Sequence, residues 1–436
     1  MKKVIIIGAG ISGLASAVLL SEAGYDVRVY ESCNHLGGRA YSFTDRDSKY
    51  IFDNGQHILM GCYKYTLEYL KKIGSFHHLD MEKKLNASFR SIDKTDFKLE
   101  CNNLPAPLHI FRGLKKIEFV SIKDLFHFFI FGTNIYFYHF LKKRKDNAKQ
   151  FLQSLNQREE IINKIWEPII ISVFNSSSTK ISAQLFIDTI YEIFFKYNQF
   201  SNFILPTSDL ENIFIVPAKK YIISNKGKIF LNKKISKVNI NKNRIVSTET
   251  VNGETIEGDV FIFSIPPNDL SHIVGINEII NENSFTNFKY SPIIAGYVLL
   301  NKQIMNDKMQ IFLNTNIQVI FNKTKICGLN TDKQLLSFVV SAAEVLIDKS
   351  INELKTLFIN ELLSLFPSFN SENILFCKII KQREATSLLD CITNNNRMTT
   401  KGKIYNMFFA GDWTDTGLPA TIESAIKSAY LLKNFF

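Results

Sequence analysis

The sequence predicts an α/β protein of two interleaved domains, and three observations support this fold class. The chain has 436 residues, which is more than a single hydrophobic core usually serves. Strand and helix patterns alternate near both ends of the chain, whereas long aromatic, helix-leaning segments fill much of its middle. No internal repeat or low-complexity linker separates these regions, so we expect the two domains to share the chain rather than follow one another.

The opening residues predict a strand, a helix and a second strand. Residues 4–7 are short, β-branched and closed by a glycine, as in a buried parallel strand. Residues 12–23 have the apolar spacing of a helix that stops at Gly24, and residues 26–30 form the next strand. Together they make one βαβ unit.

The remaining segments are expected to alternate between the two domains. We expect a short helix over residues 67–73 and helix-leaning structure from about 76 to 205, including 158–174 and 182–195. Strand patterns return over 228–267, with Asn252-Gly253 as a hairpin turn, and again after Ser291, followed by a helix near 351–365. A first domain is therefore predicted over 1–75, 207–270 and 395–436, and a second over 76–206 and 271–394.

Composition excludes several classes of function. There are 52 Lys and Arg residues against 41 Asp and Glu, a formal charge of +11, but the lysines are scattered and no nucleic-acid-binding motif accompanies them. We therefore expect no nucleic-acid partner. The six cysteines lie far apart with no C-x-x-C pair, which favours reduced thiols in a cytoplasmic protein and no metal site.

Three glycines follow the first strand with the spacing of a phosphate-binding loop. Gly8 permits a tight turn, Gly10 lets the backbone approach a pyrophosphate, and Gly13 allows helix and strand to pack closely. The first helical residues, Ile11 and Ser12, would present backbone N–H groups to that anion. The stretch alone does not choose between NAD, FAD and simple turn glycines.

Other motifs favour FAD over a nicotinamide cofactor. Glu31 ends the second strand, where a carboxylate can accept from ribose hydroxyls and would repel a 2′-phosphate. Gly37-Gly38-Arg39 offers a second backbone approach and a guanidinium suited to phosphate. Near residue 411, a strand, a Gly411-Asp412 turn and a helix from Thr421 and Ile422 could face the ribityl chain and the flavin ring. Nucleotide motifs this far apart in sequence predict a long cofactor that both ends of the chain bind.

The chain resembles the amine oxidase and phytoene desaturase superfamily of flavoproteins through its opening βαβ unit, its Glu31-to-Arg39 element and the AGDW…PATIESA stretch. More specifically, it resembles the hydroxysqualene dehydroxylase family. The blocks that carry this likeness are DNGQHILMGCYKYTL (53–67), LPAPLH (104–109), WEPIIISVFNSSSTKISAQLF (166–186) and GDWTDTGLPATIESAIKSA (411–429). Residues 382–398 match the family only around Arg383 to Thr386. The resemblance implies bound FAD and reduction of hydroxysqualene to squalene, with an unidentified electron donor.

The resemblance also implies further site residues. Val238, in a strand of the first domain, is expected to bind adenine through its backbone, although ordinary strand packing is an equal reading. His57 is the candidate general acid, because histidine titrates near neutral pH. It could instead satisfy a buried backbone group. Asp53 and Gln56 could order the loop beside the flavin, and Asp415 is another candidate acid.

An aromatic stretch near residues 122–145 has three possible roles. It could line a tunnel for an isoprenoid chain, form ordinary helix core, or lie in a membrane surface, with the following Lys142 to Lys145 run against anionic lipid or simply solvated. At 17 residues, with internal His and Asn, residues 125–141 are at the short limit for a spanning helix. We expect a cytoplasmic protein that is peripheral on the inner face of the membrane.

Two rival functions remain open at this stage. A carotenoid-type desaturase or a flavin amine oxidase would use the same cofactor in the oxidising direction. A prenyl-binding escort protein of the GDP dissociation inhibitor type would use a related fold without redox chemistry. The Gly37-Gly38-Arg39 and Gly411-Asp412 motifs argue against the escort protein, because it has no flavin to bind.

Overall fold

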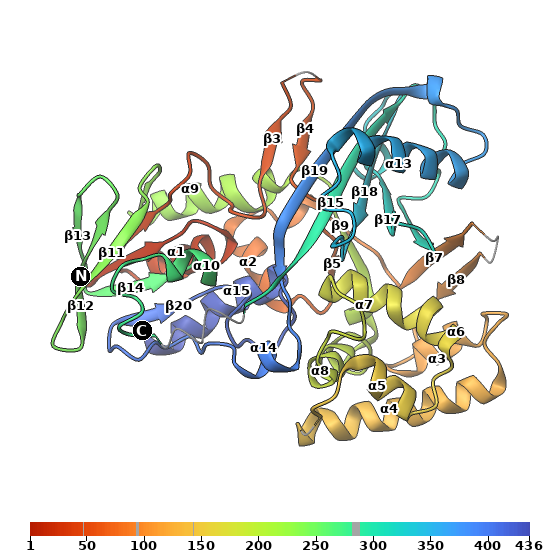
Figure 1. Ribbon diagram of the computed structural model, residues 1–436, viewed down its shortest axis with the longest axis horizontal. Coiled ribbons are helices and arrows are strands. Elements are labelled where there is room, and N and C mark those ends of the chain that lie inside the picture. Colours follow the sequence, from red (N-terminus) through yellow and green to blue (C-terminus); the bar gives the residue numbers. More distant parts are fainter. Residues whose placement is uncertain (47, 93–95, 143, 281–287) are drawn as a thin grey trace.

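A parallel sheet of five strands joins segments that lie far apart in the sequence. The computed structural model describes residues 1–436 except 47, 93–95, 143 and 281–287. The opening unit is β1 (Lys3–Ile7), α1 (Ile11–Glu22) and β2 (Asp26–Tyr30). The sheet order is β10-β2-β1-β14-β20, with β10 (Lys228–Phe230), β14 (Val260–Phe263) and β20 (Met407–Phe409). Every pairing in it is parallel, and both chain termini lie at this end of the molecule (Figure 1).

Helix α1 lies at the centre of this first domain. Every residue from Ile11 to Ser21 is buried, because the sheet covers one side of the helix while α15 (Ile422–Leu432) and α9 (Val216–Ser224) cover others. A helix enclosed in this way has no solvated polar face, which explains its run of apolar and small residues. The predicted hairpin is confirmed: Gly253 has φ +80°, and its N–H donates to Thr250 O between β12 (Arg244–Thr250) and β13 (Thr255–Glu257). On its other side β12 pairs with β11 (Ile235–Asn241).

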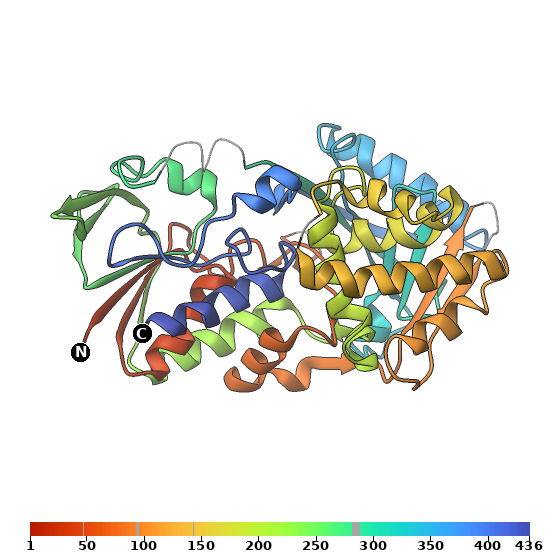
Figure 2. The same ribbon diagram turned by 90° about the horizontal axis from the view of Figure 1, so that it is seen from below.

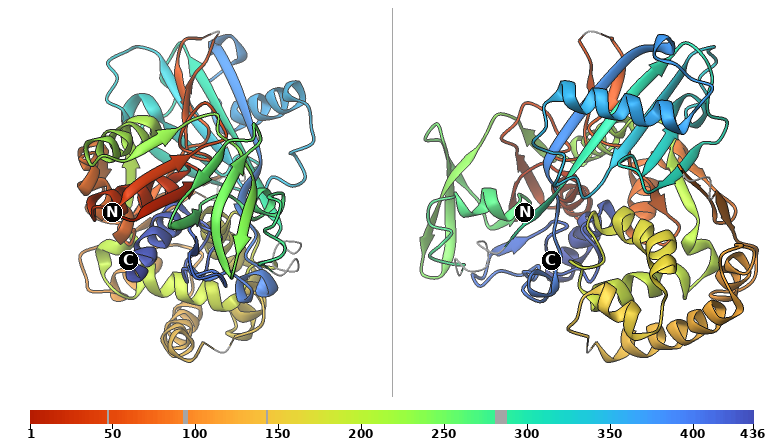
Figure 3. Two further views of the ribbon diagram at one scale, coloured as in Figure 1. Left: turned by 90° about the vertical axis from the view of Figure 1, so that its left-hand side faces the viewer. Right: turned by 45° about the vertical axis from the view of Figure 1, so that its right-hand side comes forward.

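A second, mixed sheet of seven strands forms the other large layer. Its order is β19-β15-β18-β17-β16-β7-β8, and its strands are β7 (Asn86–Ser91), β8 (Phe97–Glu100), β15 (Tyr290–Leu300), β16 (Met309–Leu313), β17 (Val319–Asn322), β18 (Gln334–Val340) and β19 (Ile374–Ser387). Helix α13 (Ile351–Leu365) covers its outer face, where Phe358 packs against Phe338 (Figure 3). Successive side chains of a strand point to opposite faces. Val319 and Phe321 therefore face away from α13.

A group of helices completes the second domain. It comprises α3 (Leu108–Leu114), α4 (Ile122–Leu141), α5 (Ala148–Ser154), α6 (Glu159–Ile161), α7 (Glu167–Phe174) and α8 (Ala183–Phe194), with a π-helical turn at Ile162–Trp166. Helix α4 runs along the outside of this group (Figure 2). Small strands connect the layers: β3 (Ser42–Thr44) pairs with β4 (Ile51–Asp53), and β9 (Phe203–Pro206) lies between β5 (Leu59–Met60) and β6 (Leu79–Met81). The short helices are α2 (Lys64–Ile73), α10 (Pro267–Ser271), α12 (Lys323–Ile326) and α14 (Cys391–Asn395).

One sequence expectation needs correction. Residues 76–205 were expected to lean to helix throughout, but β6, β7 and β8 lie among them. In β7 the buried and more exposed residues alternate, and β7 pairs in parallel with β16, more than 200 residues further along the chain. The period-two pattern is short, and its pairing partner is remote, so local sequence does not reveal it. The α/β class is as predicted, while the domain boundaries stay a prediction.

A buried carboxylate on α15 binds the first turn of α2, which lies more than 350 residues earlier in the chain. Glu423, in the first turn of α15, accepts hydrogen bonds from the backbone N–H groups of Tyr65 (2.9 Å) and Thr66 (2.8 Å) and from Thr66 Oγ1 (2.7 Å). Those N–H groups belong to the first turn of α2, whose N-cap Tyr63 supplies no side-chain acceptor. Glu423 therefore caps α2 from another part of the chain.

We expect Glu423→Gln to lower the free energy of unfolding by about 2 kcal/mol. The amide is a weaker acceptor than the carboxylate, and its NH₂ group would face the N–H groups of Tyr65 and Thr66, which are also donors. Chemical denaturation followed by circular dichroism measures this loss. The matched control is Glu372→Gln, at an exposed position of the second domain, which should change stability by less than about 0.5 kcal/mol. Equal stability of Glu423→Gln and wild type would contradict the capping role.

Candidate functional site

The glycine loop after β1 leaves a backbone surface open to a ligand. Gly8 has φ +98°, and a Cβ on Gly13 would lie 2.1 Å from Gly8 O, so glycine is needed at both positions. A Cβ on Gly10, in contrast, meets nothing within 4 Å. Gly10 is also the N-cap of α1, and as glycine it offers the first-turn N–H groups no side-chain acceptor. The end of α1 is thus free to bind an anion.

Glu31 is fixed beside this loop by its own hydrogen bonds. Its carboxylate is buried and accepts from the Ala9 N–H at 2.7 Å, the Cys33 N–H at 2.9 Å and Ser32 Oγ at 3.1 Å. A carboxylate has about four acceptor positions, so one stays available for a ribose hydroxyl. The side chain is therefore oriented before any ligand binds.

Val238 does not lie beside Glu31. It is buried in the core under the antiparallel sheet, and its N–H donates to Val274 O at 2.9 Å. Instead, the backbone N–H groups of Asn232 and Lys233, at the start of the same segment, donate to the carbonyl oxygens of Cys33 and Glu31. The part of this segment that adjoins Glu31 is thus several residues before the predicted Val238, and Val238 does not line the cleft described below.

A second glycine pair brings Arg39 to the C-terminal motif. Gly37 N–H donates to Ala9 O at 2.9 Å, and a Cβ on Gly38 would lie 3.1 Å from Gly10 Cα, so the two glycine loops touch backbone to backbone. Arg39 donates to Ala385 O at 3.0 Å and forms an ion pair with Asp412, whose side chain is 7% exposed. The ion pair connects residues 39 and 412 across the site.

Arg397 holds the turn that carries Asp412, and no sequence motif points to it. Its guanidinium is buried and donates to Leu418 O at 2.7 Å, to Asp412 O at 2.9 Å and to Thr416 Oγ1 at 3.3 Å. Burial lowers the pKa of Arg397 to about 10, so it stays charged at neutral pH. It lies in the stretch that departs from the resembled family, and no motif spacing marks it.

Helix α15 begins at the same place. Thr421 is its N-cap and accepts from the Ser424 N–H, and Ile422 is its first residue. The adjacent Gly411 N–H donates to Ser428 Oγ at 2.8 Å, which ties the end of β20 to this helix. Like α1, α15 therefore presents a positive helix end to the site.

These elements surround one cleft of about 540 Å³. Eleven of the predicted cofactor residues line it: Gly8, Gly10, Ile11, Ser12, Glu31, Gly38, Arg39, Gly411, Asp412, Thr421 and Ile422. Gly13 and Val238 do not; Gly13 acts through packing on Gly8. Apolar side chains from the second domain and the loop after β4 supply a further wall: Ile58, Val173, Ile293, Val319, Phe321 and Val339.

The four predicted catalytic residues divide into two pairs. Gln56 and His57 line the cleft, whereas Asp53 and Asp415 do not. Asp53 is buried, and its Oδ1 accepts from Ser42 Oγ at 2.8 Å and from the Leu210 N–H at 2.9 Å. Asp415 is exposed to solvent. Asp53 is thus held by Ser42 and Leu210 behind the lining of the cleft, and the roles expected of Asp53 and Asp415 stay predictions.

The charge state of His57 follows from its surroundings. Burial lowers the pKa of the imidazole; the Asp53 carboxylate raises it in part, and Lys323, whose Nζ lies 3.8 Å from Asp53 Oδ2, lowers it further. The balance is a pKa below the usual 6.5, so His57 is mainly neutral at pH 7. A neutral imidazole can still donate one N–H to a substrate oxygen.

The cleft has unsatisfied polar atoms that fit a flavin dinucleotide. Ser264 Oγ, beside Gly8, and Gln56 Oε1 are both buried, line the cleft and have no hydrogen-bond partner within the described residues. Buried polar atoms seldom stay unpaired. Together with two helix N-termini and Arg39, they provide donors for phosphates and partners for ring heteroatoms, as FAD requires.

We expect Gly10→Val to abolish FAD binding without unfolding the protein. The backbone at Gly10 (φ −67°, ψ 179°) suits any residue, and the new side chain would occupy the open space where a pyrophosphate must approach. The predicted loss of affinity is at least about 100-fold, or about 2.7 kcal/mol, measured by titration of the apoprotein with FAD. Gly8→Val is the contrast: its Cβ would lie 2.7 Å from Ile265, so the melting temperature should fall as well. Full FAD occupancy in Gly10→Val would contradict this placement.

Comparisons with known proteins agree with this geometry. The chain is 25% identical to the hydroxysqualene dehydroxylase of Zymomonas mobilis, over 97% of this chain and 96% of that protein. It is 22% identical to the 15-cis-phytoene desaturase of Arabidopsis thaliana, over 98% of this chain and 78% of that protein.

Solved structures share the fold. An oxidoreductase from Methanosarcina mazei superposes with a TM-score of 0.78 at 15% identity, covering 99% of this chain and 100% of that one. Putrescine oxidase bound to putrescine gives 0.72 at 14% identity, covering 99% and 98%. The family model of flavin-containing amine oxidoreductases matches residues 11–431. The chain is therefore a member of the flavin-containing amine oxidoreductase family, an FAD-dependent oxidoreductase rather than an escort protein.

Proposed function

We propose that this enzyme reduces hydroxysqualene to squalene, with reduced FAD as the hydride source. The observation that carries the proposal is that the cofactor-binding motifs and an apolar wall line the same cleft. That wall contains Ile293 of β15, Val319 and Phe321 of β17, and Val339 of β18. Such a surface suits a long hydrocarbon.

The charges of the cleft favour a neutral substrate over an amine. Three carboxylates line it among the described residues: Glu31, Asp269 and Asp412. All three lie in the segments assigned to the cofactor domain, and Asp412 is already paired with Arg39. The wall from the second sheet carries no carboxylate in the part of the chain that the structure describes, so an ammonium group there would lack a counter-charge.

The relatives support an isoprenoid substrate. The Zymomonas mobilis protein and two further relatives named hydroxysqualene dehydroxylase, from Rhodopseudomonas palustris and Sinorhizobium fredii, match 97–98% of this chain at 22–25% identity. The plant desaturase of Arabidopsis thaliana, which matches 98% of this chain, is named for phytoene, also an isoprenoid. At these identities they favour a substrate class, and the apolar cleft agrees with it.

The residues of the chain have separable roles in this reaction. We assign the pyrophosphate to the glycine loop and Arg39, the adenosine ribose to Glu31, and the flavin ring to the N-terminus of α15. When bound and reduced, FAD supplies a hydride. The protonated fraction of His57 donates a proton to the allylic hydroxyl of the substrate, whose C–O bond breaks to release water and leaves His57 neutral. The apolar wall keeps out water that would otherwise recapture the allylic cation before the hydride forms the new C–H bond at that carbon.

We expect the dithionite-reduced, FAD-loaded enzyme to convert hydroxysqualene into squalene under anaerobic conditions, with about one product per flavin. Mass spectrometry of the organic extract measures the product, and loss of reduced flavin measures its oxidation. The control is Gly10→Val treated in the same way, which should yield none. If oxidised enzyme is instead bleached by phytoene or by an amine while hydroxysqualene is unchanged, the enzyme is a desaturase or an amine oxidase.

We expect kcat/KM for hydroxysqualene to rise as pH falls from 8 toward 6, because His57 is mainly neutral at pH 7 and more of it is protonated at lower pH. His57→Gln should lower kcat about 100-fold and flatten this pH profile. The matched control is His35→Gln, since His35 lines the same cleft but stacks on Tyr41 at a ring distance of 4.5 Å. An unchanged pH profile in His57→Gln would exclude His57 as the proton donor.

A further inference from the structure

Helix α4 presents a continuous aromatic face to solvent. Six large apolar side chains are exposed at spacings of three, four or seven residues, with one adjacent pair, and at 3.6 residues per turn these positions share one side of the helix. Ile122 is 87% exposed, and the others are 56–61% exposed: Phe126, Phe129, Tyr136, Phe137 and Phe140. We call these six residues the α4 aromatic face. The helix runs along the outside of the second domain (Figure 2), where a partner can reach it.

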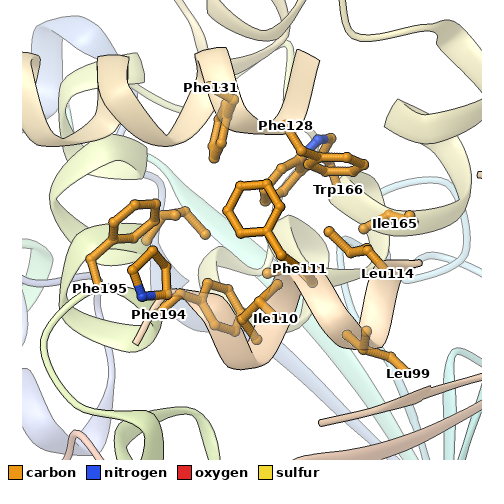
Figure 4. A pocket seen from close by; sticks show the side chains of 13 residues that line it. Leu99, Ile110, Phe111, Leu114, Phe128, Phe131, Ile165, Trp166, Phe194 and Phe195 are labelled. Carbon is orange, nitrogen blue, oxygen red and sulfur yellow. The ribbon is translucent and has the colours of Figure 1, made fainter. Parts of the chain in front are cut away.

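The fold does not use this face, because α4 has a separate inward face. Phe128, Phe131 and Ile135 are buried, and Phe131 packs on Trp166 with ring centroids 4.5 Å apart. Phe128 and Phe131 also close a small apolar pocket of about 40 Å³ between α3, α4 and α8 (Figure 4). No α4 residue lines the cofactor cleft, so the structure gives the exposed aromatic residues no contact with the cofactor site. An exposed aromatic row of this size marks an interaction surface.

Positive charge surrounds the α4 aromatic face. Residues 108–149 contain nine lysines and arginines but only three acidic residues, and four of the nine form ion pairs: Lys116 with Glu100, Lys142 with Asp188, Arg144 with Asp146 and Lys149 with Glu159. Two of those acids are already paired with arginine, Asp124 with Arg158 and Asp146 with Arg144. Lys123 and Lys145, near the two ends of α4, are exposed and have no ion-pair partner among the described residues. Lys143 of the expected basic run lies outside those residues.

We propose that the α4 aromatic face docks in the plane of a membrane whose surface carries anionic lipids. An amphipathic helix with an aromatic side and basic flanks lies at the boundary between headgroups and acyl chains, where rings bury in the apolar layer and lysines meet the headgroups. The opposite side of α4 stays packed on the protein, so the contact is peripheral. Consistent with this, none of the described helices is long and apolar enough to cross a bilayer. The proposal does not depend on which substrate the enzyme reduces.

The test is flotation of the FAD-loaded enzyme with vesicles of two parts phosphatidylcholine to one part phosphatidylglycerol. We expect the wild type to float with these vesicles, and binding to fall at least tenfold with pure phosphatidylcholine or at high salt. Phe129→Ser/Phe137→Ser should reduce binding to the anionic vesicles by at least about tenfold. Retained FAD absorbance and an unchanged melting temperature show that this variant is folded.

The matched control is Val345→Ser/Tyr405→Ser, which removes two side chains that are 88% and 74% exposed elsewhere on the molecule and should leave vesicle binding unchanged. Failure of the wild type to float, equal binding to both kinds of vesicle, or wild-type binding by the α4 variant would each overturn the proposal. So would a concentration-dependent dimer, seen by analytical ultracentrifugation, that the α4 variant loses, because the face would then bind a second copy.

Discussion

The parallel sheet brings the glycine loop after β1 next to the Gly411-Asp412 turn after β20, and the other features of the site depend on this constraint. β14 pairs with β1 on one side and with β20 on the other, so the turn after β20 falls beside the turn after β1. The carboxyl ends of parallel strands meet at one edge, which is where α/β sheets bind ligands. The Arg39–Asp412 ion pair spans the space between these turns, and Arg397 fixes the second one.

Two kinds of wall then define what the cleft can do. The first domain supplies helix ends, backbone N–H groups and Arg39, all suited to a phosphate-containing cofactor. The second domain supplies the side chains of every other strand residue, such as Val319 and Phe321. The residues that alternate with them, such as Ile320, point to the opposite face of the sheet and pack with α13. One sheet thus divides its side chains between the core and the cleft, and in the cleft a polar surface adjoins an apolar one.

Sequence could predict the parts of the site that depend on local backbone geometry. Gly8, Gly10 and Glu31 belong to one βαβ unit, so their spacing alone places them together. The position of Asp53 could not be predicted in this way, because tertiary packing brings its hydrogen-bond partners, Ser42 and Leu210, to it. Arg397 was missed for the same reason: all of its acceptors lie 15 to 21 residues further on, in an irregular turn. Likewise, the aromatic residues of α4 occupy both of its faces, so composition could not show which ones the core buries.

The position of β20 in the chain also orders the events of biosynthesis. This strand is more than 140 residues beyond β14, the strand that it pairs with in the sheet. At ribosomal rates of about 5–20 residues per second, the N-terminal βαβ unit is made well before Asp412 emerges. Until then Arg39 lacks its carboxylate and α2 lacks the Glu423 cap. The complete lining of the cleft therefore exists only after β20 and the start of α15 have been translated.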